Sequence, residues 1–346
     1  MRQGKVLYEQ DIEDLETYLH EKHCIIVVDE NTHRHCLPIF LKTLPSLAAA
    51  FVVTLKVGES CKSLAQYQYL LEKLVDAKAN KQTVLIALGG GSICDVAAFA
   101  ASTYMRGIPL VLLPTSYLAM VDAAHGGKTA INFGETKNLV GSFYPADITF
   151  VEPNFTSTQS DRDFNAGIAE LLKQALLQGE ERWQAVCACA TRADYCAQLP
   201  SAINYKRQLV DQDPYDNAVR QTLNLGHTIG HALEAYYLQT DTPLLHGEAV
   251  AFGLIAELFV AEHLLGTAEK IRIELSKQVE KLFDSSVLRR PAATQALLDL
   301  MLLDKKSNAS IRMSLLQHYG DCKIKVEVPV QLATEAVQNL FSQYAS

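Results

Sequence analysis

The chain has 346 residues, of which 49% are hydrophobic and 20% are charged, as is usual for a globular protein large enough to form two domains. Its net charge of -8 excludes an overall basic field for nucleic acid or an anionic membrane, and no apolar stretch reaches the ~20 residues that span a bilayer. An anionic ligand would therefore have to be held by local Lys and Arg side chains.

The N-terminus and the cysteines indicate where the protein works. The segment Met1-Arg2-Gln3-Gly4-Lys5-Val6 lacks the hydrophobic core of a signal peptide. The eight cysteines are scattered and include no CxxC pair. In a chain of this size they are expected to be reduced and mostly buried. The expected location is the cytoplasm.

The first part of the chain alternates strand-like and helical segments. Helical spacing of apolar residues extends from Ser63 to Lys78, with Leu64, Tyr67, Leu70, Leu71 and Leu74 on one side. Short apolar runs typical of buried parallel strands occur at Cys24–Asp29, Ala50–Leu55, Val84–Leu88 and Leu110–Pro114. Such alternation predicts a parallel sheet covered by helices in residues 1–160. From about Asp161 long helices dominate, which predicts a mainly helical second domain over residues 161–346.

A glycine-rich turn follows the third predicted strand. Gly89-Gly90-Gly91-Ser92 ends that strand and opens a helix, where backbone N–H groups can hold a pyrophosphate. The GxGxxG dinucleotide fingerprint is missing, and a plain tight turn explains the glycines equally well. Asp29 and Glu59 lie at or beyond the ends of strands, where they can bind ribose hydroxyls or serve as solvated loop acids.

Three histidines and a glutamate favour a metal site. His227 and His231 are four residues apart, so that on a helix they share one face, and His246 follows a polar break after that segment. An isolated HxxxH pair more often only packs. Glu170, however, interrupts an apolar helical segment, and a buried carboxylate is costly unless it is paired or bound to a metal.

Cations occur in otherwise uncharged surroundings in several places. Most single lysines are solvated surface groups, but a phosphate and a carboxylate together need several cations around them. The candidates are Arg106, Lys128, Lys137, Lys173, Lys206, Arg220, Lys305 and Lys306.

From about Asp29 to Lys306 the chain resembles the 3-dehydroquinate synthase family. The motifs that carry this resemblance occur in order: Gly89-Gly90-Gly91 through Asp95, Ala101 through Gly107, Pro114-Thr115, Asp122 through Lys128, Lys137-Asn138, Ala169-Glu170 through Lys173, and the two histidine motifs. The resemblance implies an α/β N-terminal domain with a parallel Rossmann-like sheet and a mainly α-helical C-terminal domain.

The resemblance also implies the cofactors. The metal would be zinc or cobalt, held by Glu170, His227 and His246, whereas spacing alone would choose His227 with His231. His231 would instead lie beside the metal, near the substrate. NAD would be surrounded by Asp29, Glu59, Lys62, Gly90, Gly91, Asp95, Thr115, Ser116, Asp122, Lys137 and Thr158.

A small anionic sugar phosphate is the substrate class that the resemblance implies. Its contacts would be Arg106, Lys128, Asn138, Lys173, Lys206, Arg220, Asn224, His231 and one of Lys305 or Lys306, with Asp122 and Lys137 also counted among them. Two departures from the family concern Ala123-Ala124-His125, where serines usually follow the Asp, and 307–310, where a glycine-containing turn is expected. His125 has no role in this pattern. The glycine-rich segment from Asp122 to Asn138 is expected to be a loop.

The implied reaction converts 3-deoxy-D-arabino-heptulosonate 7-phosphate to 3-dehydroquinate and phosphate in the shikimate pathway, with NAD used catalytically by a homodimer. Another sugar-phosphate cyclase, of the inosose or valiolone synthase type, would share the fold, NAD and metal. A metal-dependent polyol or alcohol dehydrogenase also uses a GGGS turn and paired histidines, but it would release NADH and would not need so many cations. A non-catalytic NAD-binding protein would have no need of Glu170, His227 and His246.

Overall fold

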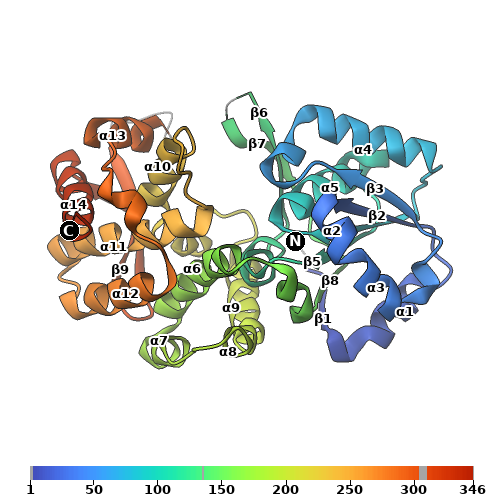
Figure 1. Cartoon of the computed structure of the whole chain (residues 1–346), viewed down its shortest axis with the longest axis horizontal. Coiled ribbons are helices and arrows are strands. Elements are labelled where there is room, and N and C mark those ends of the chain that lie inside the picture. Colours follow the sequence, from blue (N-terminus) through green and yellow to red (C-terminus); the bar gives the residue numbers. More distant parts are fainter. Residues whose placement is uncertain (1–2, 135, 304–309, 346) are drawn as a thin grey trace. The chain divides into compact units, whose positions relative to one another are not determined.

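The computed structural model describes residues 3–134, 136–303 and 310–345. It divides into two compact units (Figure 1). The first comprises Met1–Ser160 and Lys206–Tyr215, and the second comprises Asp161–Tyr205 and Asp216–Ser346. The sequence pattern did not predict that residues 206–215, the second half of a helix and the turn after it, group with the first unit.

A six-stranded sheet forms the centre of the first unit, in the order β1-β8-β5-β4-β2-β3. All neighbouring strands in it are parallel. The strands are β1 (Lys5–Tyr8), β2 (Cys24–Asp29), β3 (Phe51–Leu55), β4 (Val84–Gly89), β5 (Leu110–Pro114) and β8 (Ile148–Val151). Every residue of β2, β4 and β5 is buried, which explains why these strands read as uninterrupted apolar runs. The four predicted strands are confirmed, and β1 and β8 were missed.

Helices cover both faces of this sheet. They are α1 (Ile12–Leu19), α2 (Glu30–His35), α3 (Leu37–Thr43), α4 (Leu64–Asp76) and α5 (Gly91–Thr103). The second half of α9 (Leu199–Gln212) also belongs to this unit. Figure 1 shows α4 on one side of β2 and β3, and α1 and α3 on the other. The predicted helix over 63–78 is confirmed as α4, which begins after Ser63 because the Ser63 side chain accepts a hydrogen bond from the Gln66 N–H.

The strand order reverses between β2 and β4. From β2 the chain passes outward to β3, then returns to β4 on the other side of β2 and continues to β5. In parallel sheets ligands bind outside the carboxyl ends of the strands at such a reversal. Asp29 is the last residue of β2 and Gly89 the last of β4, so both lie at this point of the sheet.

The segment expected to be a glycine-rich loop is largely an antiparallel hairpin. Its strands are β6 (Lys128–Phe133) and β7 (Thr136–Phe143), and the register pairs Lys128 with Phe143. The prediction was wrong because the β-branched and apolar residues of Thr129–Ile131 form a regular ladder despite the nearby glycines. The hairpin carries Lys128, Lys137 and Asn138.

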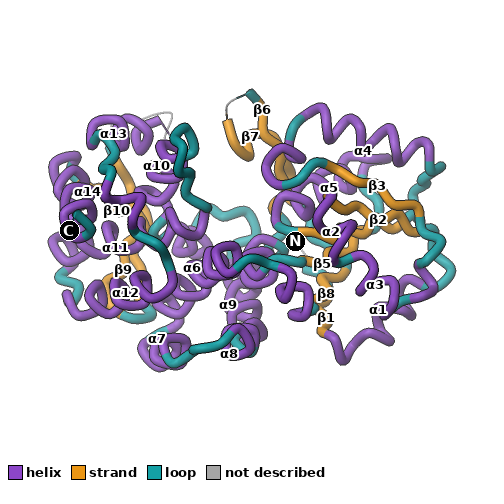
Figure 2. Tube along the Cα trace, viewed as in Figure 1, coloured by secondary structure: helices purple, strands orange, loops and turns teal. Residues whose placement is uncertain are grey.

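The second unit is mainly helical, as predicted (Figure 2). Its helices are α6 (Asp161–Gln178), α7 (Glu180–Cys187), α8 (Arg192–Cys196), the first half of α9, α10 (His227–Tyr237), α11 (His246–Leu265), α12 (Glu269–Leu282), α13 (Thr294–Leu303) and α14 (Val330–Gln343). An antiparallel hairpin of β9 (Ile311–His318) and β10 (Asp321–Val328) was not predicted. Within the described ranges no helix is both long and apolar enough to cross a bilayer.

The central helix of the second unit is α11, which is buried on all sides from Gly247 to Leu258. It touches α10 with almost no space between the two backbones. A Cβ atom added to Gly253 would lie 2.1 Å from the carbonyl oxygen of Gly226 and 2.8 Å from the Cα atom of Gly230. Only glycine fits there, because both partners are backbone atoms that cannot turn away as a side chain can.

We expect Gly253→Ala to lower the free energy of unfolding by on the order of 1–3 kcal/mol or more, since the added methyl group must push α10 and α11 apart. The matched control is Gly266→Ala, just after the same helix, where the space is open and the cost is the backbone strain of a φ of +69°, on the order of 1–2 kcal/mol. Urea unfolding of both variants measures the difference. A loss at Gly253 no larger than that at Gly266 would contradict the close contact.

Candidate active site and metal centre

A buried carboxylate lies in the middle of α6. Glu170 is 1% exposed and forms an ion pair with Lys173, one turn later on the same helix and equally buried. Burial alone would raise the pKa of Glu170, but the Lys173 ammonium and the His227 imidazole outweigh it and hold that pKa well below its usual range. The carboxylate is therefore ionised and able to bind a cation.

Two histidines from other helices face this carboxylate. The Nε2 atom of His227, the first residue of α10, is 3.4 Å from Glu170 Oε1, and the Nε2 atom of His246, the first residue of α11, is 3.6 Å from it. Two ligand atoms on a tetrahedral zinc ion lie roughly 3.3–3.4 Å apart, given metal–ligand bonds of about 2.0–2.1 Å. Both distances to Glu170 Oε1 are thus close to the spacing of a tetrahedral ligand set, and all three donor atoms lie within 4.8 Å of one another.

Hydrogen bonds at the far side of each ring determine which nitrogen faces Glu170. His227 Nδ1 is 3.1 Å from the carbonyl oxygen of Leu225, and His246 Nδ1 is 2.9 Å from Glu234 Oε2. Since both partners can only accept, each Nδ1 carries a proton, and Nε2 is the nitrogen that faces Glu170. Glu170 and Glu234 raise the pKa of His246 to about 10, against the effect of burial, so a metal that binds its Nε2 would displace a proton. Pinned imidazoles of this kind, one of them held by a carboxylate, are usual around protein-bound metals.

The backbone near His227 is held by a second buried acid. Glu257, on α11, is fully buried and accepts hydrogen bonds from the N–H groups of Gly226 (2.6 Å) and Ile229 (3.0 Å), which satisfies the N-terminus of α10. Gly226 has a φ of +80°, so the chain turns sharply into His227. The sequence analysis missed Glu257, although it interrupts an apolar helix just as Glu170 does.

A glycine contact also places His246. A Cβ atom on Gly247, the next residue of α11, would lie 1.7 Å from the carbonyl oxygen of Ala166 on α6. Helix α11 therefore begins in backbone contact with the helix that carries Glu170. Glu248 follows in the first turn of α11, where it accepts two hydrogen bonds from Arg162 of α6, at 2.6 and 2.7 Å.

A second group of possible ligands shares His246. His231, Glu234 and His246 also have donor atoms within 4.8 Å of one another. The ring centroids of His227 and His231 are 5.1 Å apart, as their spacing on one helix face predicts. In this second group the Glu234 carboxylate already accepts from His246 Nδ1, and His231 is exposed. Glu234 was missed, although it lies seven residues after His227 on the same helix face.

Two further residues expected to contact substrate come from the 3₁₀ helix Val219–Asn224, which leads into α10. Arg220 is buried with 4% of its surface exposed, whereas Asn224 is exposed. Lys305 and Lys306, together with 307–309 of the unusual turn, lie outside the described residues.

In the first unit, the glycine-rich turn has the geometry of an anion site. Gly90 precedes the first turn of α5 and Gly91 begins it, so the N–H groups of a 13-residue helix start at the carboxyl end of β4. Nearby acids are also held in place. Asp29 accepts a hydrogen bond from the Thr32 N–H at the start of α2, and Glu59 accepts from Ser92 and from Asn132. Thr115 and Ser116 follow β5, the next strand of the sheet.

Lys62 connects the start of α5 with the β6–β7 hairpin. Its buried ammonium group is 2.6 Å from Asp95 Oδ2 and also donates to the side-chain oxygen of Asn138. The Asn138 N–H in turn donates to Asn132, whose amide contacts Glu59. The expected nucleotide-site and substrate-site residues Glu59, Lys62, Asp95 and Asn138 thus form one hydrogen-bonded network.

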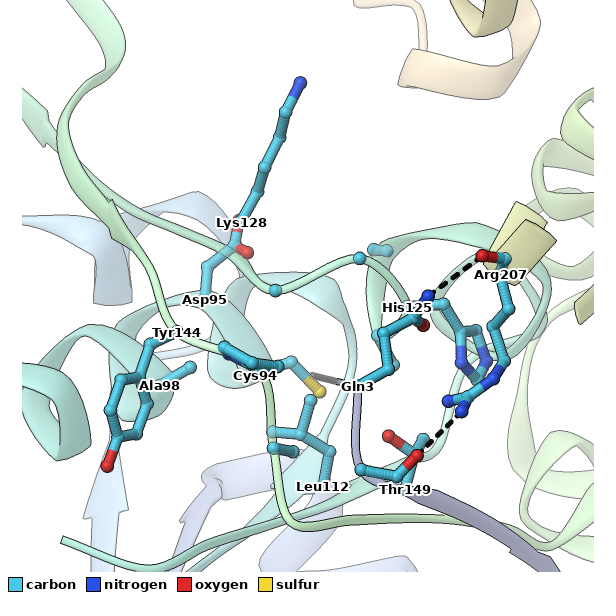
Figure 3. Close-up of a pocket in the computed structure, with 17 residues that line it drawn as sticks. Gln3, Cys94, Asp95, Ala98, Leu112, His125, Lys128, Tyr144, Thr149 and Arg207 are labelled. Atoms are coloured by element: carbon cyan, nitrogen blue, oxygen red, sulfur yellow. Dashed lines mark hydrogen bonds between the residues drawn. The ribbon is translucent and has the colours of Figure 1, made fainter. Parts of the chain in front are cut away.

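Asp122 and Lys206 form a second pair in this unit. Lys206 Nζ is 2.7 Å from Asp122 Oδ1 and 2.6 Å from the Asp122 carbonyl oxygen, although the two residues are far apart in the chain. The next residue, Arg207, donates to the Gly4 carbonyl oxygen at 2.7 Å, and the Gln3 amide donates to the Arg207 carbonyl oxygen at 2.9 Å (Figure 3).

Other expected site residues lie on the surface. Arg106, Lys128, Lys137 and Thr158 are exposed, and Arg106 has a φ of +60° in the turn after α5. Figure 3 shows the Lys128 side chain extending away from the other labelled residues of its pocket. All eight cysteines are free thiols, of which five are buried.

Comparison with known proteins identifies the family. The N-terminal model of 3-dehydroquinate synthase matches residues 52–166, and the C-terminal model matches residues 167–307. A 3-dehydroquinate synthase of Legionella pneumophila is 39% identical over 330 residues, which cover 91% of this chain and 86% of that protein. The chain therefore belongs to the 3-dehydroquinate synthase family of enzymes.

Solved structures support the fold. A 2-deoxy-scyllo-inosose synthase complexed with carbaglucose-6-phosphate, NAD+ and Co2+ has a TM-score of 0.84 at 24% identity, covering 97% of this chain and 96% of that one. The 2-epi-5-epi-valiolone synthase from Streptomyces hygroscopicus, with NAD+ and Zn2+ bound, has a TM-score of 0.82 at 22% identity, covering 99% and 98%. The α/β unit followed by a helical unit is thus the fold of the sugar-phosphate cyclases.

Replacing His227 by Ala should abolish tight binding of a divalent metal while leaving the fold intact, because one of three converging donor atoms is lost from a site whose remaining ligands stay in place. Metal content after dialysis, together with circular dichroism, measures both effects. His231→Ala is the matched control, and it should retain the metal. If instead His231→Ala lost the metal and His227→Ala kept it, the second group of ligands would be the correct one.

The buried His125 generates a prediction about pH. Burial and the neighbouring Lys206 and Arg207 cations lower the pKa of His125 to about 3, against the opposing effects of the Met120 carbonyl and Asp122. Below the ordinary pKa of 6.5 the unfolded chain binds a proton here that the folded chain does not. Stability is therefore lost as the pH falls from 6.5 toward 3, by roughly 1.4 kcal/mol per pH unit from this group.

Urea unfolding of the wild type and His125→Gln over that range isolates the contribution, because all other groups titrate alike in both proteins. The variant should lose stability less steeply on acidification. Equal slopes would show that folding does not lower the pKa of His125.

Proposed function

We propose that this enzyme converts 3-deoxy-D-arabino-heptulosonate 7-phosphate to 3-dehydroquinate and phosphate, the cyclisation step of the shikimate pathway, with NAD used catalytically and one divalent metal ion. The observation that carries the proposal is the convergence of Glu170 Oε1 with the Nε2 atoms of His227 and His246, in a chain of this family. Substrate and product are at the same oxidation level overall, so the cofactor is regenerated in each cycle.

The donor set fits zinc or cobalt. One carboxylate oxygen and two imidazole nitrogens leave a coordination position for water or a substrate oxygen, as catalytic zinc sites require. We propose Glu170, His227 and His246 as the ligands, with His231 beside them near the substrate. Lys173 supports this metal site, because its ion pair with Glu170 keeps the carboxylate ionised and oriented before the metal binds.

The first unit fits a dinucleotide. Gly90 and Gly91 offer helix N–H groups for the pyrophosphate, next to the reversal in strand order. We propose that Asp29 and Glu59 accept hydrogen bonds from ribose hydroxyls. The remaining proposed NAD contacts are Lys62, Asp95, Thr115, Ser116, Asp122, Lys137 and Thr158. NAD would supply a reversible hydride acceptor, and the metal would act as a Lewis acid on the substrate hydroxyl.

The chain's own side chains would handle the anionic groups of the substrate. Buried Lys206 and Arg220 can bind phosphate and carboxylate in places where water cannot screen the charge, and so stabilise the negative charge that develops as phosphate departs. We assign Lys128, Lys173, Asn138, Asn224 and Arg106 to the same group of substrate contacts. A dehydrogenase acting on a neutral polyol would gain nothing from so many cations.

Two finer features complete the proposal. We propose that the enzyme acts in the cytoplasm, which its eight unpaired cysteines support, because an oxidising compartment would tend to link them. We also propose a homodimer, on the family resemblance. We propose no nucleic-acid or membrane partner, because a net charge of -8 disfavours binding to these anionic surfaces.

The test is to incubate the metal-loaded enzyme with the heptulosonate phosphate and far less NAD than substrate, and to follow phosphate release and NADH absorbance together. Phosphate should accumulate over many cycles with no lasting NADH signal, and a chelator should stop it. Glucose 6-phosphate is the control substrate for the inosose-forming alternative, and it should release no phosphate. Stoichiometric NADH without phosphate would establish a polyol dehydrogenase instead.

A further inference from the structure

His125 is a buried histidine that the reaction does not explain. Only 3% of its surface is exposed, and its Nε2 atom is 2.8 Å from the Met120 carbonyl oxygen. Because a carbonyl can only accept, Nε2 carries the proton and Nδ1 is the unprotonated nitrogen. Nδ1 is buried and has no hydrogen-bond partner among the described residues. Figure 3 shows the ring on the side of the pocket that carries Arg207.

The Met120 carbonyl belongs to an unusual turn. Residues Ala119–Ala123 form a π-helix, in which the Ala124 N–H donates to the carbonyl of Ala119 at 3.0 Å. Continuing that pattern, the N–H of His125 would donate to Met120. It donates to the Asp122 carbonyl oxygen instead, at 3.0 Å. The Met120 carbonyl oxygen therefore lies close to the side-chain Nε2 of His125 and not to the backbone N–H of the same residue.

This turn is also where Asp122 holds Lys206. The Asp122 carbonyl oxygen accepts from both the His125 N–H and Lys206 Nζ, and the Asp122 carboxylate forms an ion pair with Lys206. Two oxygen atoms of one residue in the turn thus contact the Lys206 ammonium. Single π-helical turns of this kind are frequently found at functional sites, where they place one side chain out of helical register.

We propose that His125 is a positioning residue. By donating a hydrogen bond from Nε2 to the Met120 carbonyl oxygen, it stabilises the conformation of the π-helical turn in which Asp122 binds Lys206. The inference rests on the proposed function, in which Asp122 and Lys206 contact the nucleotide and the substrate. A neutral donor is required here, because a charged one would be repelled by Lys206 and Arg207. The low pKa of His125 agrees with this requirement.

A matched pair of variants tests whether the donor must stand at the position of Nε2. His125→Gln carries an amide nitrogen near the position of Nε2, whereas His125→Asn carries the same amide one atom closer to the backbone, near Nδ1. We expect the Asn variant to lose about 10–100-fold in kcat/KM for the heptulosonate phosphate, since a small misplacement of a binding group is that costly. The Gln variant should retain activity close to that of the wild type. His23→Asn, at an exposed histidine of the same unit, should have no effect.

A double-mutant cycle tests the route through Lys206 without relying on turnover. If His125 acts through the pair, then the shift in urea midpoint of His125→Asn combined with Lys206→Met should fall short of the sum of the two single shifts. Equal loss of activity in the Gln and Asn variants, or additive shifts, would overturn the proposal. An inactive wild type with a non-additive cycle would refute the proposed substrate and leave the positioning role standing.

The tautomer offers a check that needs no variant and therefore no assumption about folding. Nitrogen NMR of the wild type should show His125 neutral and protonated at Nε2 near neutral pH. A proton on Nδ1 instead would overturn the proposal, because the ring would then have no hydrogen to donate to Met120.

Discussion

The metal centre depends on how closely α11 approaches its neighbours. The helix contacts α6 through Gly247 and α10 through Gly253, and at both places a Cβ atom would lie 2.1 Å or less from a backbone oxygen. Helices that carry larger residues at the contact pack with their axes about 8–10 Å apart. Here the backbones touch, which lets the short side chain of Glu170 on α6 reach the first residues of α10 and α11.

Close packing of this kind puts charge where water cannot reach, so each charge must be compensated locally. Glu170 is compensated by Lys173 on its own helix and by the two imidazoles, whereas Glu257 is compensated by the N–H groups and the dipole of α10. The two acids therefore have different roles. Glu257 makes the N-terminus of α10 rigid, and Glu170 faces the histidine that this terminus carries.

The sequence was sufficient for those features in which local pattern and environment agree. The four central strands and α4 were predicted because uninterrupted apolar runs and helical spacing follow directly from burial. Glu170 was found because a lone acid in an apolar helix needs a partner. The β6–β7 hairpin, β9–β10 and the grouping of residues 206–215 with the first unit depend on partners distant in sequence, which no local pattern reveals.

The histidine ligands show the same limit more sharply. Spacing on a helix favoured His227 with His231, and their rings are indeed neighbours at 5.1 Å between centroids. What distinguishes His246 is the hydrogen bond from its Nδ1 to Glu234, a residue of a different helix. With Nδ1 bound in this way, the opposite nitrogen, Nε2, faces Glu170. Spacing can show that rings are close, but only the partners of the opposite nitrogen show which atom each ring presents.

The same principle explains why His125 belongs to no metal centre despite its unpartnered nitrogen. Its protonated nitrogen is pinned by a carbonyl, as in His227, but at Nε2 rather than Nδ1. The unprotonated nitrogen is therefore Nδ1, and the cations Lys206 and Arg207, which lower the pKa of His125 against the opposing effect of Asp122, would also repel a metal ion. Neither group of possible ligands among the described residues includes His125. Whether a hydrogen-bonded imidazole binds a metal or stabilises a turn thus depends on two things. One is which of its nitrogens is hydrogen-bonded, and the other is which charges surround the remaining nitrogen.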